Sequence, residues 1–313
     1  MVLERSPLSK LQTGPATALE TSPALSMYIL ACEVEDKAAG TITTYSQRIN
    51  KFLKYARLPE SEITANDVRQ FLYSLKQEGI NPSTGNAFYR AIKTYFNWLA
   101  AEGIIDKEKS PMINIKAPKI PKILPVPFSL DDIKALHRET SRPRFLDYRN
   151  RAIVFVFLDT GIRLEEMSNL KIADVDIKQG MIKVLGKGSK ERVVVIQQEA
   201  RKALLHYLLR RQDDYDCLWV NEERRPLTRS GVRNMVVKLC ERAGIKDAKC
   251  GPHTFRHTAA ILSLRNGMGV FTLQLMLGHS TLAMTRRYVS SLGAEDLLRE
   301  HKKASPVDNL NLK

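Results

Sequence analysis

The sequence contains no long apolar run and no closely spaced cysteine pair. No stretch approaches the ~20 consecutive apolar residues that a membrane-spanning helix needs. Near the N-terminus, Ser6, Pro7 and Ser9 interrupt the region where a signal peptide would have its apolar core. We therefore expect a cytoplasmic protein without a membrane partner.

The four cysteines are Cys32, Cys217, Cys240 and Cys250. They form no C-x-x-C pair, and their scatter is typical of reduced, partly buried thiols. Cys240 and Cys250, with the two histidines that follow them, loosely resemble a zinc site, but the cysteines are too far apart for a zinc knuckle. The sequence also lacks an acidic cluster resembling a two-metal site. We expect neither a metal ion nor another cofactor.

Length and composition indicate a soluble globular protein with two domains. A chain of 313 residues is long for a single hydrophobic core. A hydrophobic content of 43% and a charged content of 27% are ordinary for a soluble protein. No internal repeat is visible in the sequence.

The net charge of +15 is concentrated in one part of the chain. Residues 1–110 contain 13 Lys and Arg against 12 Asp and Glu, a net of +1. Residues 111–313 contain 36 against 22, a net of +14. Such an excess suggests a surface that binds a polyanion, although solubility alone can also explain a basic composition. Phosphate chemistry in the same segment would favour nucleic acid as the partner.

A flexible tail and a helical domain are predicted for the N-terminal third. Residues 1–21 are polar and rich in Ser, Thr, Pro and Gly, which predicts the tail. Residues 22–110 contain apolar stripes at helical spacing that predict four helices. The first stripe consists of Met27, Leu30 and Ala31.

Two of these four helices have clear start signals. Thr64 with Asp67 resembles a capping box. Asn81 before Pro82 marks the other start. We interpret the aromatic residues of the last helix as core rather than as platforms for stacked bases; they are Phe88, Tyr95, Phe96 and Trp98.

Two basic segments are candidates for contacts with phosphate. Arg48, Lys51 and Lys54 recur every three residues on the second helix, which indicates either a solvated face or a set of phosphate contacts. Residues 111–128 are rich in proline, which predicts a semi-rigid linker between the domains. Its lysines can follow a sugar-phosphate backbone; they are Lys116, Lys119 and Lys122.

A second domain is predicted at residues 129–301, followed by a tail at 302–313. Ser129 with Asp132 is a typical helix N-cap, and the apolar run 153–158 predicts a buried helix. Further helices are expected at roughly 199–211, 228–243, 253–266, 270–277 and 281–290.

One small sheet is predicted within this domain. Two β-branched runs, 181–185 and 192–196, flank a Gly-rich turn and predict a hairpin. Residues 217–220 are a candidate third strand. The predicted fold class is therefore mainly α with a small β-sheet (α+β).

Short motifs in the second domain supply what metal-free phosphoryl transfer to a protein hydroxyl needs. They are Thr160-Gly161-Ile162-Arg163, Gly186-Lys187-Gly188, His253-Thr254-Phe255-Arg256, Leu277-Gly278-His279 and Arg286-Arg287-Tyr288. Arginine can bind a phosphate bidentately, and tyrosine can attack it. The order of these motifs closely resembles that of the tyrosine recombinase (phage integrase) family, over roughly residues 22–300. The resemblance implies a helical, SAM-like core-binding domain followed by a tyrosine recombinase catalytic domain.

The resemblance also implies roles for the cationic residues. Arg163 and Arg256 are the two phosphate-binding arginines, and His253 shares a helix face with Arg256. Glu166, one helical turn after Arg163, is the acidic residue that holds the first guanidinium, although a pair that only stabilises the fold is an alternative. His279 occupies the position that contacts the phosphate.

The remaining roles fall to a lysine, a tyrosine and a supporting histidine. Lys187 lies at the tip of the predicted hairpin and, by resemblance, protonates the leaving 5′ oxygen, with Lys190 and Arg192 as competing candidates. Tyr288 is the nucleophile by resemblance. Phenols ordinarily ionise near pH ~10, so a tyrosine nucleophile needs cationic neighbours. His257 points about 100° away from Arg256 around the helix, and we assign it a supporting role.

The resemblance implies a site-specific recombinase that acts on double-stranded DNA at specific core sites. Cutting and rejoining would pass through a covalent 3′-phosphotyrosyl intermediate, without metal or ATP. Alternatives are relaxation of DNA in the manner of a type IB topoisomerase, or sequence-specific DNA binding without catalysis. Two duplexes with two strands each imply a homo-tetramer, or a hetero-tetramer with a related recombinase, assembled on DNA through a C-terminal helix at Glu295–His301. A nucleoid-associated location follows.

Overall fold

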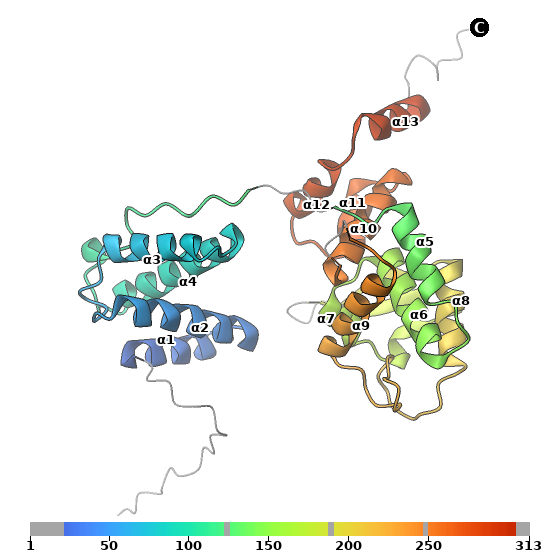
Figure 1. Cartoon of the computed structure of the whole chain (residues 1–313), viewed down its shortest axis with the longest axis horizontal. Coiled ribbons are helices and arrows are strands. Elements are labelled where there is room, and N and C mark those ends of the chain that lie inside the picture. Colours follow the sequence, from blue (N-terminus) through green and yellow to red (C-terminus); the bar gives the residue numbers. More distant parts are fainter. Residues whose placement is uncertain (1–21, 122–125, 187–190, 247–249, 305–313) are drawn as a thin grey trace, which may run out of the picture. The chain divides into compact units, whose positions relative to one another are not determined.

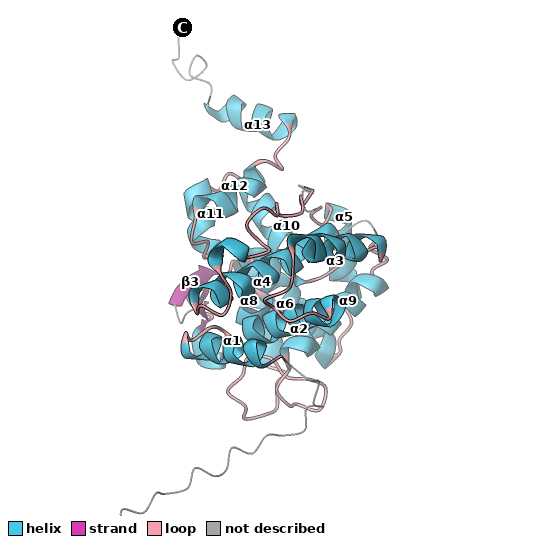
Figure 2. Ribbon diagram, turned by 90° about the vertical axis from the view of Figure 1, so that its left-hand side faces the viewer, coloured by secondary structure: helices cyan, strands magenta, loops and turns pink. Residues whose placement is uncertain are grey.

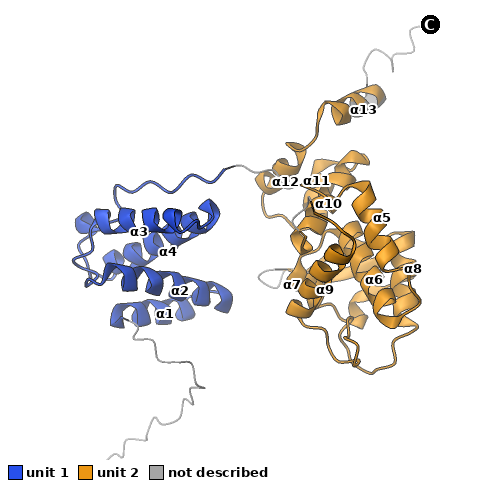
Figure 3. Cartoon of the chain, in the orientation of Figure 1, with its two compact units in different colours: residues 1–122 blue, residues 123–313 orange. Residues whose placement is uncertain are grey.

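The chain forms two compact units, residues 1–122 and 123–313 (Figure 3). A computed structural model describes residues 22–121, 126–186, 191–246 and 250–304. The predicted tail at 1–21, Lys122 and Lys187 lie outside the described residues. Each unit has its own hydrophobic core.

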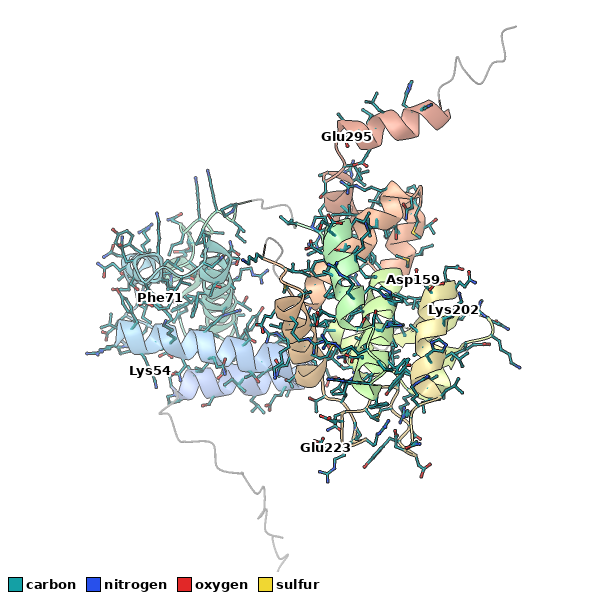
Figure 4. The ribbon with its side chains drawn as sticks, turned by 45° about the vertical axis from the view of Figure 1, so that its right-hand side comes forward. Lys54, Phe71, Asp159, Lys202, Glu223 and Glu295 are labelled. Carbon is teal, nitrogen blue, oxygen red and sulfur yellow. The ribbon has the colours of Figure 1, made fainter. Side chains whose placement is uncertain are left out.

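The described part of unit 1 is a helical bundle (Figure 1). Its core is rich in aromatic residues. Its helices are α1 Pro23–Val34, α2 Ala39–Ala56, α3 Ala65–Gln77, α4 Pro82–Ala101 and the short 3-10 helix Lys107–Lys109. Phe71, labelled in Figure 4, makes edge-to-face contacts with Phe52 and Phe88 at centroid distances of 5.2 and 5.6 Å. Such aromatic pairs stabilise a core beyond the burial of their area.

The starts of α3 and α4 confirm the predicted capping signals. The Thr64 hydroxyl accepts from the backbone N–H of Asp67, and the Asp67 carboxylate accepts from the backbone N–H of Thr64 at 2.8 Å. The Asn81 side chain accepts from the backbone N–H of Ser83 at 2.9 Å. These bonds satisfy amide groups that a helix leaves unpaired at its N-terminus.

The predicted apolar stripe of α1 is wrong in its position around the helix. Met27 and Leu30 are 54% and 60% exposed, whereas Leu25, Tyr28 and Cys32 are buried. Both sets have helical spacing, so periodicity alone does not choose between them. Tertiary packing determines which face is buried, because the Tyr28 ring packs against Tyr95 and Trp98 on α4.

Unit 2 is mainly helical, with one small antiparallel sheet that Figure 2 shows in magenta, and this confirms the predicted fold class. Its helices are α5 Leu130–Glu139, α6 Phe145–Thr160, α7 Leu164–Ser168, the 3-10 helix Ile172–Asp174, α8 Gln198–Leu208, α9 Arg229–Arg242, α10 Pro252–Arg265, α11 Val270–Leu277, α12 Leu282–Val289 and α13 Ala294–Ala304. None of the helices in the described ranges is long and apolar enough to cross a bilayer.

The hairpin is confirmed, but the third strand is not the predicted one. Strands β2 Met181–Leu185 and β3 Glu191–Val195 pair in register, and β1 Val175–Asp176 completes the sheet beside β2. Residues 217 and 220 make isolated bridges only. The apolar run between them is buried in the core, with Trp219 1% exposed, and this burial explains its strand-like composition.

Candidate active site

Arg163 is positioned by the turn between α6 and α7. Helix α6 ends at Gly161, which has a left-handed backbone with φ of 60°. A Cβ atom at this glycine would lie 2.8 Å from the Leu277 side chain, so the turn packs closely against the end of α11. Arg163 then caps α7, and its side chain is partly exposed.

Glu166 lies at the centre of an arginine pair. Its Oε1 accepts from Nη1 of Arg163 and Nη1 of Arg192, both at 2.8 Å. Its Oε2 accepts from Nη2 of Arg192 at 2.9 Å and from the backbone N–H of Arg163 at 2.6 Å. Burial alone would raise the pKa of Glu166, but the bonds from Arg192 and Arg163 outweigh it and lower the pKa to about 2. The carboxylate is therefore ionised at neutral pH.

Arg256 extends from α10 toward the same turn. Its Nη1 donates to the carbonyl of Gly161 at 2.7 Å, and its Nη2 donates to the carbonyl of Leu277 at 2.8 Å. Burial, together with the nearby charge of Arg163, lowers the pKa of Arg256 to about 10. The guanidinium therefore stays protonated at neutral pH although only 5% of the residue is exposed.

The C-terminal end of α11 accepts one hydrogen bond from each of three arginines. Nε of Arg192 donates to the carbonyl of Met276 at 3.2 Å, Arg256 donates to Leu277, and Nη2 of Arg163 donates to Gly278 at 3.2 Å. Carbonyls at the end of a helix have no partner within the helix and carry partial negative charge. These three carbonyls thus gather guanidinium groups from α10, β3 and the α6–α7 turn.

His279 follows directly after this helix end. It is 7% exposed, and its Nδ1 lies 2.8 Å from the Thr285 hydroxyl on α12. Its ring stacks on that of Tyr288 at a centroid distance of 6.1 Å and an interplanar angle of 13°. Burial, with the charges of Arg256 and Arg163, lowers the pKa of His279 to about 4.

Tyr288 lies on α12, which packs against α10 and α11 (Figure 1). Its hydroxyl is 3.1 Å from Nδ1 of His257 and 3.1 Å from Nη2 of Arg287. The residue is fully buried, in a small cluster with apolar side chains of α10 and α11. The phenolic oxygen is therefore in direct contact with a histidine ring nitrogen and with a guanidinium group.

His253 lies one turn before His257 on α10 and is exposed. Partial burial of its ring, with the charges of Arg256 and Arg287, lowers the pKa of His253. The structure thus brings together seven predicted site residues: Arg163, Glu166, His253, Arg256, His257, His279 and Tyr288. Lys187 lies outside the described residues.

The predicted DNA-contact residues of unit 1 differ in their surroundings. Arg48 and Lys51 approach the Phe88 ring at 5.9 and 5.8 Å, and Lys51 also lies 3.5 Å from Glu78. Lys54, labelled in Figure 4, is exposed on α2. Lys116 and Lys119 are exposed as well.

Sequence reasoning missed the structural part played by Arg192 and by Thr285. A signal for Arg192 existed, because alternation along β3 places it on the same face as the buried Val194. An arginine on a buried strand face needs a carboxylate partner. No comparable pattern in the sequence indicates the contact between Thr285 and His279.

Comparison with known proteins identifies the family. Residues 25–106 match the phage integrase N-terminal SAM-like domain, and residues 128–295 match the phage integrase family. Tyrosine recombinase XerC of Thermodesulfovibrio yellowstonii is 30% identical over 279 residues, covering 86% of this chain and 91% of that protein. Tyrosine recombinase XerA of Pyrococcus furiosus is 31% identical over 293 residues, covering 92% and 96%. The chain is a Xer-like tyrosine recombinase of the phage integrase family.

A solved structure shares the recombinase's fold. The XerH site-specific recombinase, bound to palindromic difH substrate in a post-cleavage complex, aligns with a TM-score of 0.70 at 23% identity. The alignment covers 91% of the recombinase and 85% of XerH. The arginines, histidines and tyrosine of the site are therefore held on a fold that is known from a recombinase.

Proposed function

We propose that the recombinase cleaves and rejoins DNA with Tyr288 as the nucleophile. The phenolic oxygen bonds to phosphorus, the bond from phosphorus to the 5′ oxygen breaks, and a 3′-phosphotyrosyl bond and a free 5′ hydroxyl result. A 5′ hydroxyl from a partner duplex then reverses the step and joins new strands. Because the covalent bond conserves the phosphodiester energy, rejoining needs no ATP. The convergence of Arg163, Arg256 and two histidines around the phenol carries this proposal.

The phenolic proton has a nearby acceptor. His257 Nδ1 lies 3.1 Å from the hydroxyl of Tyr288. Burial and the neighbouring Arg287 lower the pKa of His257 to about 4, so the ring is neutral at neutral pH; this makes it a weak base, but its unprotonated nitrogen can accept the phenolic hydrogen. We assign the phenolic proton to His257. By resemblance, Lys187 protonates the leaving 5′ oxygen.

The phosphate would be held by groups that are already oriented. Arg163 and Arg256 are fixed by carbonyls of the α11 end, so their charges need no rearrangement when the phosphorane forms. His253 and His279 supply further donors. If the Thr285 hydroxyl donates to Nδ1 of His279, the ring proton resides on Nε2, which can then donate to a non-bridging oxygen.

Cleavage also requires a movement of α12. Tyr288 is fully buried, with its ring stacked on His279, so its oxygen has no path to a duplex in this arrangement. The helix lies between Thr281 and Ser290, which are flanked by short turns. We propose that binding of DNA and of a second protomer shifts α12 and exposes the phenol.

DNA binding is assigned to the basic residues of both units. We propose phosphate contacts for Arg48, Lys51 and Lys54 on α2 and for the linker lysines 116, 119 and 122. Each contact releases counterions from DNA, so affinity should fall steeply as salt rises. A flat dependence of affinity on salt would contradict this assignment.

A tetramer is the proposed active assembly, because two duplexes contain four strands to be cut. Leu297 and Leu298 on α13 are 69% and 70% exposed, which fits a helix that docks on a neighbouring protomer. Deletion of residues 293–313 should therefore weaken cooperative assembly on DNA, as measured by gel shift. Unaltered cooperativity would count against this role of α13.

Neither alternative function is favoured by the comparisons. The two relatives described above, which match most of the chain, are tyrosine recombinases, not topoisomerases. The seven described site residues are also brought together, which does not fit a protein that binds DNA without catalysis.

A nicked suicide substrate tests the proposed chemistry. The wild-type recombinase should trap a covalent protein–DNA adduct, whereas Tyr288→Phe should bind the same DNA and form none. Tyr215→Phe is the matched control, since Tyr215 is 47% exposed and lies outside the site. An adduct with the Tyr288→Phe variant would show that another residue is the nucleophile.

A further inference from the structure

We propose that Arg192 is a positioning residue for cleavage, which acts by holding Glu166 and the end of α11 in place. The inference rests on the proposed function of the site, and it concerns a residue to which that proposed function gives no role. Its support comes from three independent features of the described residues: the geometry of the ion pair, the carbonyl contact and the packing of Gly278.

The ion pair between Arg192 and Glu166 is bidentate. Nη1 and Nη2 of Arg192 donate to the two carboxylate oxygens at 2.8 and 2.9 Å. The carboxylate side chain is 4% exposed and that of Arg192 is 14% exposed. Parallel bonds of this kind fix the plane and direction of both groups. Arg192 therefore sets the orientation in which Glu166 meets Arg163.

The second feature ties β3 to the end of α11. Nε of Arg192 donates to the carbonyl of Met276 at 3.2 Å. This carbonyl lies three residues before His279, on the helix end that also orients Arg163 and Arg256. One side chain thus contacts both the acidic residue beside the first arginine and the helix that leads to His279.

The third feature is the close approach of Gly278. A Cβ atom at this position would lie 3.0 to 3.1 Å from the Nε, Cδ and Cζ atoms of Arg192. Glycine at 278 therefore leaves room for the guanidinium of Arg192. Its left-handed backbone, with φ of 63°, also requires a residue that tolerates this conformation.

Direct binding of the phosphate by Arg192 fits the geometry less well. All three nitrogen atoms of its guanidinium donate to protein groups, whereas Arg163 and Arg256 each use two of theirs for bonds with described residues. Arg163, by contrast, is 35% exposed and keeps a freer guanidinium edge. Positioning is also distinct from help with the leaving group, which the proposed function gives to Lys187.

Two variants separate charge from geometry. Arg192→Met should slow adduct formation on the suicide substrate by about 10²-fold, because small displacements of phosphate-binding groups are costly in rate. Arg192→Lys keeps a charge without the bidentate fork, and its rate should lie between those of Arg192→Met and the wild type. Lys183→Met removes an exposed hairpin cation that pairs with Glu191 and should leave the rate unchanged.

A double-mutant cycle tests whether Arg192 acts through Glu166. If it does, Arg192→Met combined with Glu166→Gln should be no slower than the slower single variant. Multiplied losses would show that the two residues act separately and would overturn the proposal. The cycle compares rates of folded proteins, so a circular dichroism spectrum like that of the wild type is required of each variant. If Arg192→Met does not fold, the same cycle is run with Arg192→Lys.

Two further measurements exclude the other roles of Arg192. Sulfur in place of the bridging 5′ oxygen gives a leaving group that needs no proton, and Arg192→Met should stay about 10²-fold slow on this DNA. Recovery to the wild-type rate would show that Arg192 helps to protonate the leaving group.

The second measurement is the salt dependence of DNA affinity. A decrease of about 0.9 in the slope of log affinity against log salt for Arg192→Met would show that Arg192 contacts a phosphate directly. Failure of wild type to form any adduct would refute the proposed function itself, whereas equal rates for wild type and Arg192→Met refute only this inference.

Discussion

The two units of the recombinase differ in what they bury. Unit 1 surrounds an aromatic core, and all the buried polar or charged side chains among the described residues lie in unit 2. They include Glu166, Arg256 and His279 of the site. The net charge divides in a similar way, with +1 on residues 1–110 and +14 on residues 111–313. Burial of a charged group costs free energy unless the group is paired. The buried charged groups therefore indicate that unit 2 is the part of the chain in which function has been favoured over stability.

The buried residues of the two units therefore contribute to different properties of the protein. Apolar packing in unit 1 determines how stable its helical bundle is, and the described residues of the candidate active site all belong to unit 2. The arginine network in unit 2 contributes to stability too, but the main role that we propose for it is to place charges around a phosphate. Substitutions in the two units should therefore change different measurements.

The largest expected effect is a loss of stability in unit 1. Phe71→Ala removes a ring that is 1% exposed and contacts three other aromatic rings. Truncation of such a side chain costs about 3–5 kcal/mol. Hydrogen exchange of the full-length protein should show faster exchange in α3 and α4 and unchanged exchange in α10 and α11.

Tyr73→Ala is the matched control for this variant. Tyr73 lies on the same helix but is 62% exposed, so its loss should change stability by less than about 0.5 kcal/mol. Faster exchange in α10 or α11 of the Phe71→Ala variant would show that the two cores are not independent.

The next effect should appear in catalysis rather than in the bundle. Arg256→Ala removes a guanidinium that fixes two carbonyls and would face the phosphate, and cleavage of the suicide substrate should slow by about 10²–10³-fold. Arg242→Ala is a suitable control, since this arginine lies on α9 in a partly exposed pair with Glu139 at 3.5 Å. Equal rates for Arg256→Ala and Arg242→Ala would remove Arg256 from the site.

Much of the fold was predictable because its signals are local. Capping boxes at Thr64 and Ser129 depend on residues three positions apart, and both are present. The hairpin also follows from a short pattern. The face of α1 was not predictable, because the choice between Leu30 and Tyr28 depends on Tyr95, far along the chain.

The site shows the same division between local and distant information. Motif order identified the candidate arginines, histidines and tyrosine, and the structure brings the described ones together. The contacts that orient them link residues far apart in sequence. Arg192 to Glu166 and Arg256 to Gly161 are examples, and no sequence period encodes such pairs. The burial of Tyr288 likewise depends on α10 and α11.

A smaller effect is expected on the pH dependence of stability, and it arises from His257 in unit 2. Histidine in an unfolded chain takes up a proton near pH ~6.5. Burial and Arg287 lower the pKa of folded His257 to about 4, so the unfolded state binds more protons between these values. The free energy of unfolding should therefore fall as the pH decreases from about 6.5 toward 4. Denaturant titrations at several pH values measure this slope.

His257→Asn tests the origin of that slope. The variant should lose less stability than the wild type as the pH falls through the window, and both should show the same slope between about pH 7 and 8. An unchanged slope for the variant below pH ~6 would show that His257 does not titrate with a lowered pKa.

The smallest expected effect returns to unit 1 and its surface. Lys54 is exposed on α2, whereas Lys51 on the same face is drawn toward Glu78 and Phe88. If Lys54 contacts a phosphate, Lys54→Gln should reduce the slope of log affinity against log salt by about 0.9 and leave the cleavage rate of bound DNA unchanged. Lys109→Gln is the control, since Lys109 is already paired with Asp106 at 2.8 Å. If Lys54→Gln has the same salt slope as the wild type, this face of α2 is a solvated surface and not a DNA contact. DNA binding would then depend on the basic residues in the segment 111–313.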